Sequence, residues 1–212
     1  TPDGRFLAAR YLNGEFWIWD LSSRETTLRV QLSKDEWSGW GMDLSADSRW
    51  VAVAASGSNT VYVYELATGS ERKRLSVPSP TGLALHPVKP ELAVASGAAA
   101  EVRIFNLDSG EARTSKPWPA SPNSLTWNSD GRLLAAGCPN NEIGLWDAMS
   151  GRMLVWKGHQ GLVSGAIFND TGRLLASRAR TRRRPRLLRR LARDLSVVRP
   201  GRRRLPGPRL AQ

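Results

Sequence analysis

Residues 129–172 read SDGRLLAAGCPNNEIGLWDAMSGRMLVWKGHQGLVSGAIFNDTG. Four short apolar runs lie in this stretch: LLAAG, EIGLWD, MLVWK and LVSGAIF. Each run has the length of a strand and is rich in β-formers, and the breaks between them, Asn140-Asn141, Ser150-Gly151 and Gly158-His159, have turn composition. The pattern then begins again, because DGRLLA at residues 130–135 recurs as TGRLLA at residues 171–176. We therefore predict a repeating unit of four antiparallel strands.

Three markers repeat along the chain in the same register. An aromatic-plus-polar pair recurs at spacings of 45, 41 and 41 residues: Trp19-Asp20, Tyr64-Glu65, Phe105-Asn106 and Trp146-Asp147. The segment that enters the second strand starts at Asp3, Asp47, Lys89, Asp130 and Thr171. A turn follows the aromatic pair at Thr68-Gly69, Ser109-Gly110 and Ser150-Gly151, with a glycine-free version at Ser23-Arg24. A fixed period of this length is the signature of a repeat architecture.

The second and third strands of each repeat have different patterns of side chains. The third strand alternates in character, as in VYVY at residues 61–64, which places one set of side chains on each face of a sheet. The second strand, such as VAVAA at residues 51–55, is apolar on both faces and suits an inner strand packed between neighbouring sheets. The chain is therefore predicted to be all-β.

These repeats resemble the tryptophan-aspartate (WD) repeat family of β-propellers, in which each repeat of roughly 40 to 45 residues forms one four-stranded blade. The resemblance covers residues 1–177 and implies an incomplete propeller with the last three strands of one blade, three complete blades and the first two strands of a fifth. Because the chain starts at Thr1 inside a repeat, we expect a fragment. The repeat-defining residues are Trp19, Asp20, Tyr64, Phe105, Trp146, Asp147, Gly158 and His159.

The sequence departs from the family pattern at two positions of the repeat. The Gly-His pair of the family occurs only at Gly158-His159. The aspartate that the family places before the third strand is replaced by Asn13, Ser58, Ala99 and Asn140. None of the repeats has the family's complete Asp-His-Ser-Trp hydrogen-bond network, so we expect blades held mainly by apolar packing.

Residues 178–212 differ sharply in composition. They contain 14 of the 31 basic residues and one of the 19 acidic residues, so residues 1–177 carry a net charge of −1. Three interpretations stay open: a shifted reading frame, a disordered tail, or a basic helix over 185–198 able to lie on nucleic acid or an anionic membrane. Nucleic-acid binding is expected only through this tail, because the repeat region has no basic excess.

No constellation of residues predicts catalysis. The two histidines, His86 and His159, and the lone Cys138 lack the spacing of a zinc site. The repeated aspartates indicate turns and strand ends, and the sequence contains no glycine loop of the phosphate-binding type. We predict no catalytic, cofactor-binding or metal-binding residue, a buried Cys138, and, from the lack of a long apolar run or signal pattern, a cytoplasmic location without a membrane span.

Partner binding is the predicted activity. In this family the loops between blades and the loops between second and third strands crowd one face, and here they include the candidate partner-binding residues Trp37, Trp118 and His159. Exposed tryptophan on a rigid loop often anchors an interface; alternatively, Trp37 packs inward and Trp118 caps a blade edge. Prolines that limit the flexibility of these loops are Pro78, Pro80, Pro117, Pro119 and Pro122.

The predicted function is that of a non-catalytic scaffold that binds a protein or peptide through the loop-rich face. The alternative from another class is the regulatory or sensory propeller of a larger enzyme, such as a bacterial Ser/Thr protein kinase. A third hypothesis is nucleic-acid binding through the basic tail, which predicts salt-sensitive binding.

Overall fold

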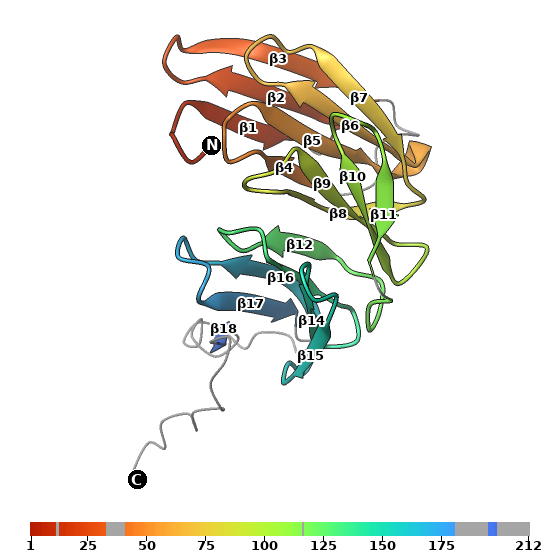
Figure 1. Ribbon diagram of the computed structural model, residues 1–212. Helices are drawn as coiled ribbons and strands as arrows, with labels where there is room; N and C mark the ends of the chain where they lie inside the picture. The colour runs from red at the N-terminus through yellow and green to blue at the C-terminus, as the bar shows by residue number, and fades with distance from the viewer. Residues whose placement is uncertain (12, 33–40, 116, 181–194, 199–212) are drawn as a thin grey trace.

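The computed structural model describes residues 1–11, 13–32, 41–115, 117–180 and 195–198 (Figure 1). These residues form three four-stranded and two three-stranded antiparallel sheets. Strands that follow one another in sequence are hydrogen-bonded neighbours within each sheet. We call the sheets blades 1 to 5 in chain order. The helical structure in the described residues is the short 3₁₀ turn η1 (Ser56–Ser58), and no helix there is long and apolar enough to cross a membrane.

The strand bounds follow the predicted repeat. Blade 1 contains β1 (Phe6–Arg10), β2 (Glu15–Asp20) and β3 (Glu25–Gln31). Blade 2 contains β4 (Met42–Leu44), β5 (Trp50–Ala55), β6 (Thr60–Glu65) and β7 (Glu71–Ser76). Blade 3 contains β8 (Pro80–Leu85), β9 (Glu91–Ser96), β10 (Glu101–Asn106) and β11 (Ala112–Thr114). Blade 4 contains β12 (Ser124–Trp127), β13 (Leu133–Gly137), β14 (Glu142–Asp147) and β15 (Met153–Lys157). Blade 5 contains β16 (Leu162–Phe168), β17 (Leu175–Arg180) and β18 (Leu195–Val198).

Blade 5 corrects the expectation for the end of the chain. It has three strands rather than the predicted two, since β17 continues past Ser177 to Arg180 and β18 pairs with it antiparallel. The helix considered over 185–198 is therefore wrong for its last four residues, Leu195–Val198. An unpaired edge of β17 presents free backbone groups that any extended segment with the right register can satisfy. The other residues of that expected helix lie outside the described part of the chain.

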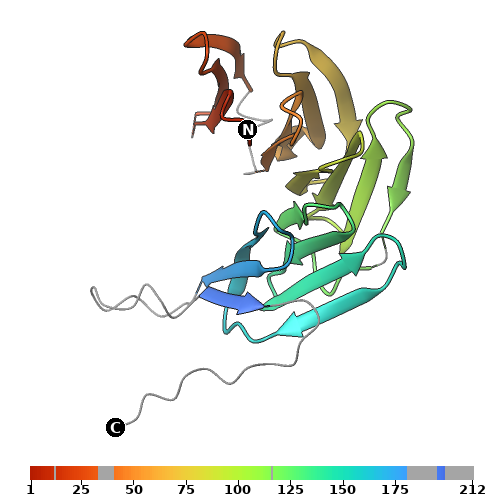
Figure 2. The same cartoon turned by 60° about the vertical axis from the view of Figure 1, so that its left-hand side comes forward.

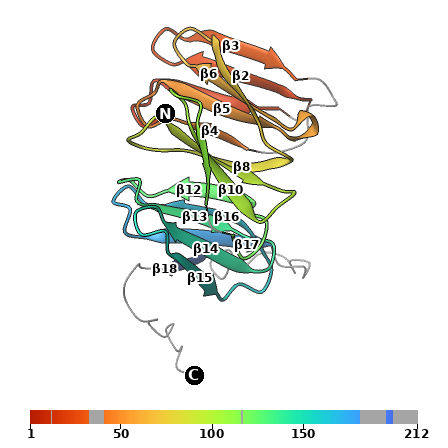
Figure 3. The same ribbon diagram turned by 45° about the vertical axis from the view of Figure 1, so that its right-hand side comes forward.

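The period-two pattern of each strand explains how the blades stack. In each of blades 1 to 4, one residue of the second strand of the repeat pairs with the aromatic residue of the Trp-Asp position, as Leu134 does with Trp146. The residues at this equivalent position are Leu7, Val51, Leu92 and Leu134. From blade 2 on, this face meets the preceding blade, and the alternate residues meet the next one. The result is an open arc of sheets (Figure 2), and Figure 3 shows them layered one after another along the arc.

Apolar side chains fill the space between successive blades, as predicted. Between blades 2 and 3, for example, Ala52, Ala54 and Val61 of one sheet pack against Leu92 and Val94 of the next, and all five are buried. Alanine at alternate positions of the inner strands lets the sheets approach closely. Each Å² of apolar surface that is buried contributes about 25 cal/mol to the free energy of folding. These interfaces are therefore the main source of stability.

The outer faces of the first and last blades are uncovered. On blade 1, Leu7 is 51% exposed and Tyr11 is 42% exposed, whereas the equivalent Val51 of blade 2 is fully buried. On blade 5, Ile167 is 64% exposed. The same position of the repeat is therefore covered by a neighbouring blade in blade 2 and exposed in blade 1.

Candidate functional site

Each blade has two chemically different ends. The antiparallel order of strands places the loops between second and third strands at the same end as the loops that join successive blades. We call this the loop-rich end; its described connections are 56–59, 77–79, 97–100, 117–123, 138–141 and 158–161. The other end, here called the turn end, carries the tight connections 21–24, 45–49, 66–70, 86–90, 107–111, 128–132, 148–152 and 169–174.

Hydrogen bonds connect the loops of the loop-rich end to one another. The Ser96 hydroxyl donates to the Pro78 carbonyl at 2.8 Å, and Ser79 N–H donates to Asn59 Oδ1 at 2.7 Å. The Thr81 hydroxyl of blade 3 donates to the Pro122 carbonyl, which enters blade 4, at 2.7 Å. These bonds join loops of blades 2, 3 and 4 into one ordered surface.

Of the three predicted partner contacts, one is in the core. The Trp118 side chain is only 3% exposed, and its indole N–H donates to Ser115 Oγ at 2.8 Å. It packs with Val102 and Ile104 between blades 3 and 4. The expected exposure of Trp118 is therefore wrong, because the side chain lies in the core between two blades. Trp37 lies outside the described residues.

The cause of this burial is a glycine on a neighbouring strand. A Cβ placed on Gly144 of β14 would lie 2.5 Å from the Trp118 ring. The absent side chain creates the space that the indole fills. Sequence alone gives no sign of this pairing, because the two residues belong to different elements and Gly144 interrupts an otherwise apolar strand pattern without indicating why.

His159 lies where the loop between blades 4 and 5 crosses β17. It is half-buried, and its Nε2 is 2.8 Å from Ser177 Oγ. This contact ties the loop to the second strand of blade 5. The family's Gly-His position thus has a hydrogen-bonding partner here although the complete network of the family is missing from the sequence.

The aspartate of the Trp-Asp pair organises the turn end of blades 1 and 4. Asp147 Oδ1 accepts the N–H groups of Met149 and Ser150 at 3.0 and 3.1 Å, and Oδ2 pairs with the Arg132 guanidinium at 2.8 Å. The Arg132 contact, together with the Ser150 and Met149 N–H groups, lowers the pKa of Asp147 to about 2. These contacts confirm that the repeated aspartates lie at turns and strand ends.

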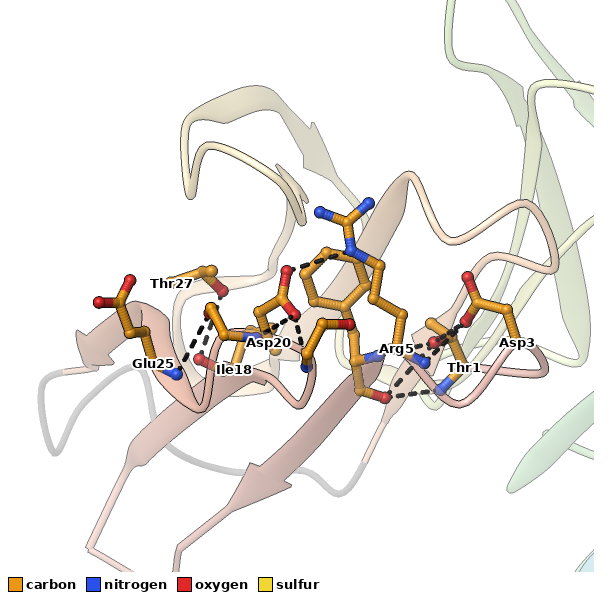
Figure 4. A network of polar contacts seen from close by, with 10 residues as sticks. Thr1, Asp3, Arg5, Ile18, Asp20, Glu25 and Thr27 are labelled. Carbon is orange, nitrogen blue, oxygen red and sulfur yellow. Dashed lines mark hydrogen bonds and ion pairs between the residues drawn. The ribbon is translucent and has the colours of Figure 1, made fainter.

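Blade 1 has the same arrangement (Figure 4). Asp20 Oδ1 accepts Ser22 N–H at 2.8 Å, and Arg5 Nε lies 3.1 Å from Asp20 Oδ2. Asp3 Oδ1 in turn accepts Arg5 N–H at 3.0 Å, which closes the turn before β1. The side-chain hydrogen bond from Thr1 is the main cause that lowers the pKa of Asp3 to about 2.

His86 connects blade 3 to blade 4 at the turn end. The side chain is 6% exposed, and Nδ1 accepts N–H groups of Val88 and Lys89 at 3.1 and 3.0 Å. Since Nδ1 accepts, the proton lies on Nε2, which donates to the Gly131 carbonyl at 3.1 Å. Desolvation lowers the pKa of His86, so the ring is neutral at pH 7. His86 is therefore a structural residue between two blades. It is more deeply buried than its position at the end of a strand suggests.

A second polar contact between blades, made by the half-buried Asp43, was not predicted at all. The Asp43 carboxylate on β4 accepts Leu85 N–H of β8 at 2.7 Å, across the interface of blades 2 and 3. Desolvation raises the pKa of Asp43 to about 6. A single aspartate inside a short, partly apolar strand offers no pattern from which its environment could be derived.

The described residues contain no group of three His, Cys, Asp or Glu side chains that could hold a metal ion. Cys138 is fully buried, as predicted, and desolvation raises the pKa of its thiol, which disfavours the reactive thiolate.

Comparison with known families supports the repeat assignment. Residues 116–147 match the family model described as WD domain, G-beta repeat. The match spans β12, β13 and β14 and ends on the Trp146-Asp147 pair. No curated protein matches the chain. The chain thus contains a WD repeat at these residues, and the sheets on both sides of it are antiparallel and blade-like and do not close into a ring within the described residues.

Proposed function

We propose that this chain is a non-catalytic scaffold that binds a protein or peptide through its loop-rich end. The observation that carries the proposal is the set of hydrogen bonds that joins the loops of blades 2, 3 and 4 into one surface. WD repeats commonly mediate protein binding, and a surface that is ordered before binding loses less conformational entropy when a partner docks. His159, which lies at this end, remains a proposed partner contact.

Bulky charged substitutions at the loop-rich end test the proposal. Ala98 and Pro139 are exposed there, on the loops of blades 3 and 4. The double variant Ala98→Arg, Pro139→Arg leaves the buried strands untouched and places two large side chains in the expected interface. Affinity capture from a cell extract, with quantitative mass spectrometry, compares the proteins retained by the variant and by the unaltered chain.

The matched control is Met149→Arg, on the turn end of blade 4, where the side chain is 82% exposed. We expect the same proteins to be retained by the control and the unaltered chain and to be lost with the double variant. Equal retention by all three chains contradicts binding at the loop-rich end.

A further inference from the structure

Two hollows adjoin at the turn end, on the side opposite the proposed scaffold surface. Each has a volume of about 250 Å³, and both are lined by Trp50, Leu107 and Asp108. One extends between the tight turns of blades 2 and 3, toward Pro87 and Val88, and the other extends along β7. We call the pair the Trp50 groove. A hollow of this volume is below the size of a typical small-molecule pocket and fits one side chain of a peptide.

Cations surround the Trp50 groove. Its basic lining residues are Arg49, Arg72, Lys73 and Lys89. They come from the turn before β5, from β7 and from the turn before β9, and only Arg72 and Lys73 are neighbours in sequence. Against four cations the lining has two carboxylates, Asp47 and Asp108. The groove is thus positive on a repeat region that is otherwise close to neutral.

These cations are not used in ion pairs within the described chain. Acidic residues near the groove already have other partners: Glu71 binds Arg74, and Glu91 binds Arg113 through two contacts of 2.8 Å. Lys73 Nζ contacts only a neutral acceptor, the Asp108 backbone carbonyl, at 3.3 Å. The positive charge of the groove is therefore available to an external anion.

The floor of the groove is apolar and aromatic. The Arg49 and Arg72 guanidiniums lie over the Trp50 ring, 4.9 and 5.6 Å from its centroid. Stacking on an aromatic face fixes a guanidinium while its N–H groups remain able to bind a carboxylate in a bidentate manner. Beside them Val88 is 74% exposed at the rim. A ligand with both carboxylates and an apolar side chain matches this lining.

We propose that the Trp50 groove is a second docking site, one that binds an acidic peptide segment of a partner protein. Carboxylates of the segment pair with the stacked guanidiniums and with Lys73 and Lys89, and an apolar side chain enters between Val88 and Leu107. A nucleic acid fits less well, because the guanidiniums lie over the ring on which a base would stack. The site is independent of the loop-rich end, so either can fail without the other.

The test uses the full chain and a fluorescein-labelled peptide that carries four Glu, one Leu and a photo-crosslinking residue. Fluorescence anisotropy gives Kd for the unaltered chain and for the triple variant Arg72→Glu, Lys73→Glu, Lys89→Glu. We expect at least about a 10-fold weaker Kd for the variant, because three attractive charges are replaced by three that repel the carboxylates of the peptide. Crosslinks are expected at residues 45–50, 72–73 and 86–90.

The matched control changes three exposed arginines elsewhere, Arg24, Arg152 and Arg173, to Glu, with the same change in net charge. It should retain the affinity of the unaltered chain. Circular dichroism checks that each variant keeps its β-structure, and the single variant Lys89→Gln, expected to weaken Kd about threefold, provides the result if the triple variant does not fold. Equal losses in both triple variants, crosslinks confined to the Arg-rich residues 178–212, or tighter binding of a single-stranded oligonucleotide at the groove overturn the proposal.

Discussion

The turn Asp-Gly-Arg occurs twice with the same internal structure and two different surroundings. In blade 1 (Asp3-Gly4-Arg5) and in blade 4 (Asp130-Gly131-Arg132) the aspartate accepts the arginine N–H, and the arginine side chain pairs with the aspartate of the Trp-Asp pair. Gly4 faces open space, whereas Gly131 lies against the His86 ring of blade 3. Local sequence therefore determines the hydrogen bonds inside a blade, and the neighbouring blade adds constraints that the motif does not contain.

The glycine of this turn gives the largest expected difference. Both glycines have a positive φ, 70° and 71°, so alanine costs about 1 kcal/mol at either position. A Cβ on Gly131 would also lie 2.1 Å from the His86 ring, which adds about 1–3 kcal/mol of overpacking. We expect Gly131→Ala to lower the free energy of unfolding by about 3 kcal/mol and Gly4→Ala by about 1 kcal/mol, measured by urea denaturation. Equal losses of unfolding free energy in the two variants would mean that the His86 ring moves away from the added methyl group without destabilising the interface between blades 3 and 4.

His86 tests the same contact from the other blade. His86→Ala leaves Val88 N–H, Lys89 N–H and the Gly131 carbonyl without their partner, and we expect a loss of about 2–3 kcal/mol. Asn106 caps the turn after β10 in the same way, because its Oδ1 accepts Asp108 N–H and Ser109 N–H, both at 2.9 Å. His86→Asn should therefore keep the cap, lose only the contact between blades, and cost about 1 kcal/mol.

Acid provides an independent measurement on this pair. The pKa of His86 is lowered in the folded state, so the unfolded chain binds the proton more tightly. The contribution of neutral His86 to stability is complete above about pH 6.5 and is lost as pH falls through the lower folded pKa. The His86→Asn variant should lose less stability than the unaltered chain between pH 7 and pH 5. An identical pH dependence contradicts a neutral, buried imidazole.

These differences also explain which features the sequence could predict. The repeat markers predicted the strands and the role of Asp20 and Asp147 at turns, because those contacts join residues close in sequence. The contact of His86 with Gly131, the burial of Trp118 against Gly144 and the positive charge around Trp50 each join residues from different strands or turns, without a periodic signal. The sequence does not show which side chain of one blade packs against which residue of the next blade.

Asp43 extends the comparison to the interface of blades 2 and 3. Its pKa is raised to about 6 from 3.8, so the folded state holds a proton that the unfolded state has lost between these pH values. Its contribution is complete below pH 3.8 and is lost as pH rises through 6. The difference in unfolding free energy between Asp43→Asn and the unaltered chain should therefore shift by about 2 kcal/mol in favour of the variant from pH 4 to pH 8. Constancy of this difference over that range would show that the carboxylate is well hydrated.

The smallest expected effect on stability comes from the arginine–aspartate ion pair that both turns contain. Arg132→Gln and Arg5→Gln each remove an ion pair whose arginine side chain is more than half exposed, 55% and 52%. Exposed pairs contribute little and are screened by salt, so both variants should lose only a small part of the free energy of unfolding at low ionic strength and less in 1 M NaCl. Because Arg132 is the main one of the contacts that lower the pKa of Asp147 to about 2, the effect of Arg132→Gln is present above pH 4 and disappears toward pH 2. A much larger loss for Arg132→Gln than for Arg5→Gln would show that this pair, too, depends on the neighbouring blade.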